Sequence, residues 1–226
     1  DSGSTPMNTA FVVPGASLAS NDIDLDGPGL NVTAVSNPTN GAVNLATGTV
    51  TFTPTTGFTG TAGFDYTVSD GSLTDSGHVT VTVTAPSFSG TLNVGTGEPI
   101  TSLTNNGGLF QALNAGTLSG NLTVNITSDM TGETGTHALN QPAETGVGGY
   151  TVFFQASGGA RLIEGSNATG LIVLNGADRV TFSGLAFGPG GLTVRNTGVG
   201  AAIRFVNDAS NNSIVNCTVE GGTSGI

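Results

Sequence analysis

Gly63-Phe-Asp-Tyr-Thr-Val68 and His78-Val-Thr-Val-Thr-Val83 alternate apolar and polar residues with a period of two. This period puts successive side chains on opposite faces of a β-strand, so one face of each segment can be buried. Segments of the same kind, separated by turn pairs such as Asn-Gly, precede them: Asn31-Val-Thr-Ala-Val35, Ala42-Val-Asn-Leu45 and Thr49-Val-Thr-Phe-Thr53. Short strands at this spacing predict an antiparallel β-sandwich over residues 1–86, with residues 1–10 as an N-terminal arm.

The order of short motifs in this region carries a family resemblance. The motifs are Asn21-Asp-Ile-Asp-Leu-Asp-Gly27, Asn40-Gly-Ala-Val43, Thr49-Val-Thr-Phe-Thr-Pro54, Gly57-Phe-Thr-Gly60 and Phe64-Asp-Tyr-Thr-Val-Ser-Asp-Gly71. In this order they resemble the cadherin-like tandem repeats of large bacterial adhesins, which are immunoglobulin-like modules. A single module is visible, not an array. The resemblance implies a secreted, extracellular protein at a cell surface.

The pattern changes near Ala85-Pro-Ser87. Residues 109–113 are the one segment that predicts a helix, because Leu109, Phe110 and Leu113 would share a face. The helix is short, so a capping role is favoured over independent stability. Apolar segments that predict further strands follow it: Asn121–Ile126, Tyr150–Phe154, Gly170–Leu174 and Arg179–Phe182.

A weak internal repeat supports a solenoid over residues 87–226. Residues 174–187 align with residues 206–219 at an offset of 32 residues. Apolar character is kept in the pairs Phe182/Ile214, Leu185/Cys217 and Phe187/Val219. Inward side chains of a solenoid stack turn on turn, so hydrophobic positions recur while the loops drift.

The segment Ser213-Ile-Val-Asn-Cys-Thr-Val219 resembles a coil of the pectate-lyase-like right-handed parallel β-helix. The segment that begins at Leu103 is similar to the N-terminal entry of such helices, a short capping helix followed by a first strand. The predicted fold class is therefore all-β, a sandwich followed by a right-handed parallel β-helix.

The acidic run Asp22-Ile-Asp-Leu-Asp-Gly27 is the strongest chemical signal. Carboxylates at alternate positions of a loop provide hard oxygen ligands for Ca²⁺, and the glycine permits a sharp turn. The run is not an EF-hand, since Thr33 stands where that motif needs glutamate. The cadherin-like resemblance implies that Asp22, Asp24 and Asp26 bind Ca²⁺. A solvated acidic turn is the alternative. Asp70 is interpreted as a turn residue.

Composition excludes several classes of protein. The net charge is −11 and only four residues are basic, so nucleic-acid binding is excluded and an anionic membrane is a poor partner. Cys217 is the single cysteine, so no internal disulfide can form. No apolar run approaches the roughly 20 residues of a membrane span, and no membrane insertion is expected. The chain begins without methionine and ends inside an apparent repeat, so we expect a processed product or a fragment.

No catalytic constellation emerges, and the sequence favours a non-enzymatic structural or adhesive surface protein stiffened by Ca²⁺. Its expected partners are other copies of itself, as in an extracellular filament or layer, or neighbouring surface modules. The alternative is a fragment of a secreted β-helical polysaccharide lyase or hydrolase, or a carbohydrate-binding protein. A sugar-binding groove normally displays aromatic residues, yet the chain has no tryptophan and only two tyrosines, which weakens that alternative. The solenoid carboxylates considered for catalysis are Asp129, Glu133, Glu144, Glu164, Asp178, Asp208 and Glu220.

Overall fold

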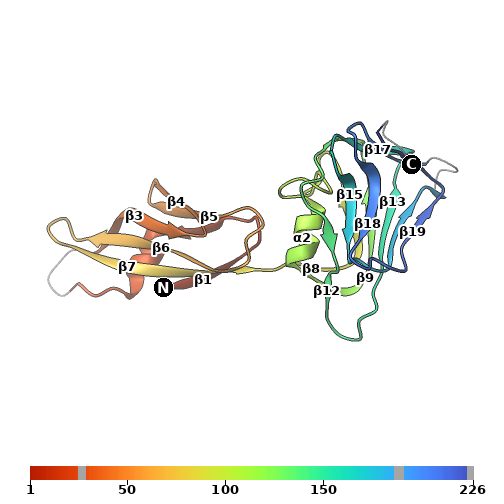
Figure 1. Cartoon of the computed structure of the whole chain (residues 1–226). Coiled ribbons are helices and arrows are strands. Elements are labelled where there is room, and N and C mark those ends of the chain that lie inside the picture. The colour runs from red at the N-terminus through yellow and green to blue at the C-terminus, as the bar shows by residue number, and fades with distance from the viewer. Residues whose placement is uncertain (25–28, 186–190, 223–226) are drawn as a thin grey trace. The chain divides into compact units, whose positions relative to one another are not determined.

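The computed structural model describes residues 1–24, 29–185 and 191–222. It divides the chain into two compact units, Asp1–Ala85 and Pro86–Ile226 (Figure 1). Nearly all regular structure in the described ranges is β, as the alternating pattern predicts. The short helical elements are α1 (Gly15–Leu18), the 3-10 turn η1 (Ala19–Asn21) and α2 (Leu109–Ala115). Within these ranges no helix has the length and hydropathy to cross a membrane.

The first unit is a sandwich of two sheets, with strand orders β1-β7-β6-β3 and β2-β5-β4. The strands of the first sheet are β1 (Ser2–Pro6), β3 (Asn31–Thr39), β6 (Gly60–Ser69) and β7 (Thr74–Thr84). Those of the second are β2 (Phe11–Pro14), β4 (Gly41–Ala46) and β5 (Thr49–Pro54). The inward residues of the alternating segments form the core, in which Phe52 and Phe64 are fully buried and stack with ring centroids 5.8 Å apart.

Residues 1–10, expected to form an arm, contain strand β1. It pairs in parallel with β7, from Ser2 opposite Thr80 to Pro6 opposite Thr84, whereas the other strand pairs of the sandwich are antiparallel. Thr5 points inward and is 5% exposed, and its hydroxyl donates a hydrogen bond to the carbonyl of Thr9. Because this hydrogen bond satisfies the buried hydroxyl, a polar segment can form an edge strand of the sandwich. A search for alternating apolar residues does not predict such a strand.

The second unit is a parallel β-solenoid of about four turns, whose strands stack into three parallel sheets. We name them sheets C, D and E. Sheet C contains β8 (Ser87–Val94), β9 (Thr117–Ile126), β12 (Ala143–Glu144), β13 (Val152–Ala156), β16 (Val180–Ser183) and β19 (Ser213–Val215). Sheet D contains β10 (Met130–Glu133), β14 (Arg161–Gly165), β17 (Leu192–Asn196) and β20 (Cys217–Glu220). Sheet E contains β11 (Leu139–Asn140), β15 (Gly170–Asn175) and β18 (Ala201–Val206).

The register of the last two turns agrees only partly with the repeat seen in the sequence. Phe182 lies opposite Ile214, as predicted. The pair Leu185/Cys217 is wrong, because Cys217 lies opposite Leu192. The pair Phe187/Val219 is wrong as well, since Val219 lies opposite Val194, and Phe187 itself is outside the described residues. The cause is loop length: residues 184–191 separate β16 from β17, whereas a single residue separates β19 from β20.

The solenoid core includes a column of aromatic rings. Phe154 and Phe182 stack with centroids 4.6 Å apart, and Phe110 of α2 meets Phe154 edge-on at 6.1 Å. The predicted helix is confirmed, and its residues Leu109, Phe110 and Leu113 are buried as expected.

Candidate functional site

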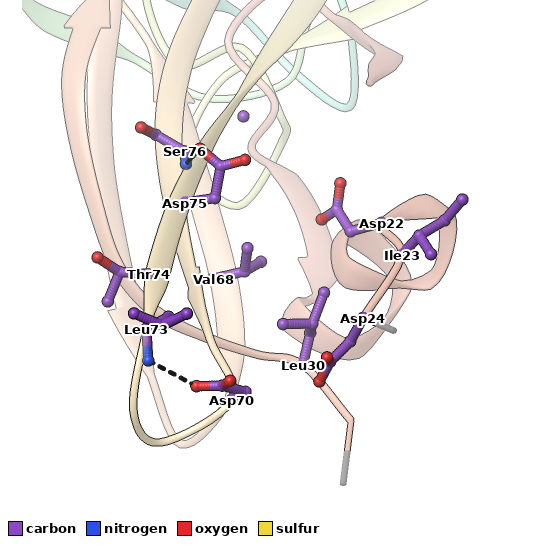
Figure 2. Close-up of a pocket in the computed structure, with 11 residues that line it drawn as sticks. Asp22, Ile23, Asp24, Leu30, Val68, Asp70, Leu73, Thr74, Asp75 and Ser76 are labelled. Carbon is purple, nitrogen blue, oxygen red and sulfur yellow. Dashed lines mark hydrogen bonds between the residues drawn. The ribbon is translucent and has the colours of Figure 1, made fainter. Parts of the chain in front are cut away.

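A pocket of about 510 Å³ opens in the sandwich unit. Carboxylates enter it from two segments: Asp22 and Asp24 follow η1, while Asp70 and Asp75 come from the hairpin between β6 and β7 (Figure 2). The remaining wall is partly apolar and includes Ile23, Leu30, Val68 and Leu73. The pocket therefore combines negative charge with apolar surface.

Asp22 is held beside a buried tyrosine. The hydroxyl of Tyr66, a residue only 3% exposed, lies 3.3 Å from Oδ2 of Asp22 and donates to Oδ2 of Asp1 at 2.7 Å. Burial, and then the negative charge of Asp22, raises the pKa of Tyr66 above its ordinary value. The hydroxyl therefore keeps its proton at neutral pH and donates it to Asp1, next to the Asp22 carboxylate.

Asp70 organises the tip of the hairpin. Its Oδ1 accepts hydrogen bonds from the amides of Ser72 (2.6 Å) and Leu73 (2.7 Å). The bonds from Leu73 and then Ser72 lower the pKa of Asp70. The interpretation of Asp70 as a turn residue is confirmed. Sequence reasoning missed Asp75, which reaches the pocket because the β6–β7 register places it opposite Val68.

The donor chemistry of this pocket fits a hard cation such as Ca²⁺, because carboxylate oxygens are the ligands that this ion prefers. Of the predicted ligands, the structure brings Asp22 and Asp24 to one pocket, while Asp26 lies outside the described residues. In the part of the chain that is described, no set of three His, Cys, Asp or Glu side chains is close enough to hold a metal ion. A complete coordination sphere would need ligands in addition to Asp22 and Asp24.

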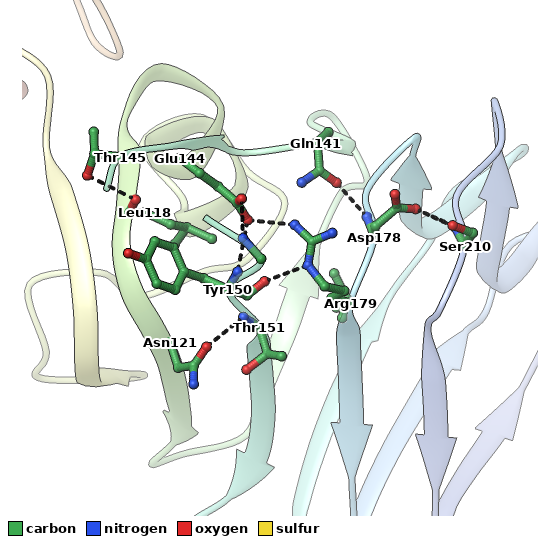
Figure 3. A network of polar contacts seen from close by, with 12 residues as sticks. Leu118, Asn121, Gln141, Glu144, Thr145, Tyr150, Thr151, Asp178, Arg179 and Ser210 are labelled. Carbon is green, nitrogen blue, oxygen red and sulfur yellow. Dashed lines mark hydrogen bonds and ion pairs between the residues drawn. The ribbon is translucent and has the colours of Figure 1, made fainter. Parts of the chain in front are cut away.

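A second polar network joins neighbouring turns of the solenoid (Figure 3). Glu144 accepts hydrogen bonds from Arg179 Nη2 (2.6 Å) and from the amides of Gly149 (2.7 Å) and Tyr150 (3.1 Å). Arg179 Nε donates to the carbonyl of Tyr150 at 3.0 Å. The adjacent Asp178 accepts from the amide and hydroxyl of Ser210. Asp178 thus meets Ser210 of the next turn.

Within this network, Glu144 and Arg179 form an ion pair. Burial acts to raise the pKa of Glu144, but the Gly149 amide and the Arg179 guanidinium outweigh it, and the pKa lies below its ordinary value. Glu144 is therefore a carboxylate at neutral pH and has no proton to donate as a general acid. Its chemistry suits a structural clamp on the loop of residues 145–149.

A third set of charges forms a ladder across sheet D. Arg195 on β17 pairs with Glu164 on β14 at 3.0 Å and with Glu220 on β20. The hydrogen bonds with Glu220 and then Glu164 raise the pKa of Arg195. Opposite charges on neighbouring turns thus follow one another along the solenoid.

We expect Glu144 to make the stability of the solenoid depend on pH. Its folded-state pKa lies below the ordinary value of 4.5, so its stabilising effect is complete above that pH and is lost as the pH falls through the folded-state pKa. Urea unfolding should show Glu144→Gln to be less stable than the parent at pH 7, by about 1–2 kcal/mol. This difference should shrink at pH 3.

The matched control for this prediction is Glu98→Gln, which removes a solenoid carboxylate with no hydrogen bond or ion pair in the described structure. It should change stability little at either pH. A Glu144→Gln difference of equal size at pH 7 and pH 3 would contradict the prediction.

The sandwich unit matches a known protein family. Residues 2–84 match the family model of the cadherin-like domain, which covers every strand of the two sheets. No curated protein and no solved structure matches the chain significantly. The match agrees with the resemblance carried by the motifs between Asn21 and Gly71.

Proposed function

Because residues 2–84 form a cadherin-like domain that is followed by a parallel β-solenoid of about four turns, we propose that the chain is a non-enzymatic, structural or adhesive part of an extracellular surface protein. The family match carries the proposal, since a cadherin-like module suggests an extracellular adhesive or surface role. Other copies of the chain or neighbouring surface modules are the proposed partners.

The solenoid charges support the non-enzymatic part of the proposal. Glu144, Glu164 and Glu220 each bind an arginine, and Asp178 binds Ser210. Hydrolysis of a sugar bond requires two carboxyl groups that face a shared substrate space, one of them protonated. Carboxylates that are ion-paired or hydrogen-bonded to neighbouring turns are better suited to stiffening the solenoid than to transferring protons.

The solenoid is proposed to be right-handed, with α2 as the cap of its first turn. Parallel strands joined by crossovers in one sheet are right-handed in about 98% of cases. The capping role is supported by Asn114 of α2, which donates to the carbonyl of Ala138 and accepts from the amide of Asn140. These two bonds occupy backbone groups at the edge of β11.

Calcium is the proposed stiffening ion of the sandwich. Asp22 and Asp24 would hold it, with Asp26 as a further ligand. Bound Ca²⁺ would neutralise carboxylates that otherwise repel one another. It would also fix the position of the segment after η1 that carries Asp22 and Asp24. An ion that binds only the folded state stabilises it by mass action.

We expect Ca²⁺ to raise the melting temperature of the sandwich, and Asp22→Asn/Asp24→Asn to abolish the rise. At a free Ca²⁺ concentration of about 100 times the dissociation constant, the stabilisation should be about 2.7 kcal/mol. Differential scanning calorimetry in Ca²⁺ and in chelator measures the shift.

Asp208→Asn is the control, because it removes one negative charge from the solenoid and leaves the pocket intact. It should retain the calcium-dependent shift. If chelator leaves the melting curve of the parent chain unchanged, the acidic run is a solvated turn and the calcium proposal fails.

A further inference from the structure

Three asparagines of the chain are followed directly by glycine: Asn40, Asn106 and Asn175. In such a pair the backbone nitrogen of the glycine can attack the side-chain amide of the asparagine, because glycine has no Cβ to block the approach. The reaction closes a five-membered succinimide ring and releases ammonia. It requires the side chain and the glycine nitrogen to move toward each other, so the fold decides which of the three pairs can react.

The pair Asn40-Gly41 is held in the turn between β3 and β4. The side chain of Asn40 donates a hydrogen bond to the carbonyl of Thr61 at 2.9 Å. Gly41 belongs to β4 and lies so close to the Phe52 ring and the Thr53 carbonyl that a Cβ atom would not fit. Ring closure would have to displace these neighbours, so the fold protects this pair.

Asn175, at the end of β15, is held on both sides of its side-chain amide. Its Nδ2 donates to Oδ1 of Asn140 at 2.7 Å, and its Oδ1 accepts from Nδ2 of Asn207 at 2.5 Å. The backbone amide of Gly176 donates to the carbonyl of Val206 at 2.9 Å. These bonds join successive turns of the solenoid, and ring closure at Asn175 would have to break several of them.

Asn106 lies outside the strands, in the segment that leads into α2, and it is exposed. Its Oδ1 lies 2.8 Å from Nε2 of His137. Because an amide oxygen only accepts hydrogen bonds, Nε2 carries the proton and donates it. The backbone amide of Gly107 donates to the side-chain oxygen of Gln111 in α2. The strand pairing that protects the other two pairs is therefore not present at this one.

The contact between Asn106 and His137 is fixed by bonds on both sides of it. The backbone amide of His137 donates to the carbonyl of Thr104 at 2.9 Å. Oδ1 of Asn105 accepts from the amide of Thr134 at 2.8 Å and from its hydroxyl at 2.7 Å. The segment with the reacting amide and the segment with the imidazole are thereby joined, so the donor is already in position before the reaction begins.

The imidazole is placed where the reaction needs a donor. Negative charge develops on Oδ1 when the glycine nitrogen adds to Cγ, and a donor held on that oxygen stabilises the charge. The C–N bond of the side-chain amide then breaks, and the amino group leaves as ammonia with the proton of the Gly107 nitrogen. Water opens the succinimide at one of its two carbonyls and gives aspartate or isoaspartate. No electrons are transferred, and water is the co-reactant.

We propose that Asn106 is a site of self-catalysed deamidation, with Nε2 of His137 as the catalytic donor. The product carries a new carboxylate beside His137. In the isoaspartate form the main chain also gains a carbon atom directly before α2. The proposal is independent of the calcium site and of the adhesive role.

The test follows the full 226-residue chain at neutral pH, folded and in urea. Peptide mapping by mass spectrometry measures aspartate and isoaspartate at each of the three asparagines over time. In the folded chain Asn106 should react at least about tenfold faster than Asn40 or Asn175, since those two pairs react only after local opening. In urea the three rates should converge, because glycine follows each of these asparagines.

His137→Leu should slow the reaction at Asn106 about tenfold, the effect of losing a hydrogen bond to the reacting oxygen. His137→Gln keeps an N–H donor and should restore most of the rate. His78→Leu is the matched control, because it removes the other histidine of the chain and should leave the rate unchanged. Circular dichroism checks that each variant folds.

Two outcomes that need no substitution would overturn the proposal. One is an Asn106 that stays unmodified in the folded chain, and the other is an equal rate at Asn106 and Asn175 there. An Asn106 rate that is the same in folded His137→Leu as in the parent would overturn it too, since the imidazole would then have no part in the reaction.

Discussion

Phe154→Ala should lower the free energy of unfolding of the solenoid by about 3–5 kcal/mol, the range for removing a buried phenylalanine. Phe154 is fully buried on β13, between Phe110 of α2 and Phe182 of the next turn. Its ring is the middle member of the aromatic column. Truncation leaves a cavity between two turns and the helix, and parallel strands fixed by backbone pairing on both sides cannot close it fully.

Chemical denaturation measured by circular dichroism gives the loss. Phe153→Ala is a matched control, because the neighbouring residue on the same strand points to the other face and is only half-buried. It should cost clearly less, about 1 kcal/mol or below. Equal losses in the two variants would contradict the assignment of Phe154 to the centre of the core.

The alternation of apolar and polar side chains was enough to locate most strands, because burying one face of a strand imposes this pattern on consecutive residues. Phe182 and Ile214 were paired correctly for the same reason, since they occupy corresponding positions in two neighbouring strands of sheet C. The pairing of Cys217 with Leu192 was not predictable in this way. It depends on the length of the connection after β16, and a repeat with loops of unequal length keeps no constant offset.

The candidate site likewise combines residues that the sequence predicts with residues that only strand pairing brings to it. Asp22 and Asp24 could be proposed from the sequence, since they are neighbours in one acidic run. Asp75 could not, because only the pairing of β6 with β7 brings it to their pocket. Strand β1 was missed because its residues are mainly small and polar, and its place in the sheet comes from backbone pairing with β7.

Glu133 is another residue whose role depends on contacts far along the chain. It appeared among the solenoid carboxylates considered for catalysis, yet it is only 2% exposed. Its Oε1 accepts from the amide of Leu103 at 2.9 Å. Its Oε2 accepts from the amide of Thr104 at 2.6 Å and from the Thr104 hydroxyl at 2.5 Å. One side chain thus satisfies three buried donors in the segment that leads into α2.

Glu133→Ala should destabilise the solenoid by about 3–5 kcal/mol. The variant leaves the amides of Leu103 and Thr104 buried without an acceptor, at a cost of about 1–3 kcal/mol for each unsatisfied group. It also leaves an empty space where the carboxylate was. Denaturant unfolding measures the total loss, and hydrogen exchange at Leu103 and Thr104 reports whether the segment before α2 has loosened.

Two further variants separate this anchoring role from a general effect of removing charge. Glu133→Gln keeps the shape and one acceptor oxygen, so it should lose about 1–2 kcal/mol, less than the alanine variant. Glu164→Ala removes a partly exposed carboxylate paired with Arg195, and an ion pair near the surface contributes about 0–1 kcal/mol. The expected order of stability is therefore Glu164→Ala above Glu133→Gln above Glu133→Ala.

If all three variants lose the same stability, or if hydrogen exchange at Leu103 and Thr104 is unchanged in Glu133→Ala, the Glu133 carboxylate does not anchor this segment. The stated order, with faster exchange confined to residues near α2, would show that Glu133, which has no cationic partner among the described residues, holds the first turn of the solenoid closed through its hydrogen bonds.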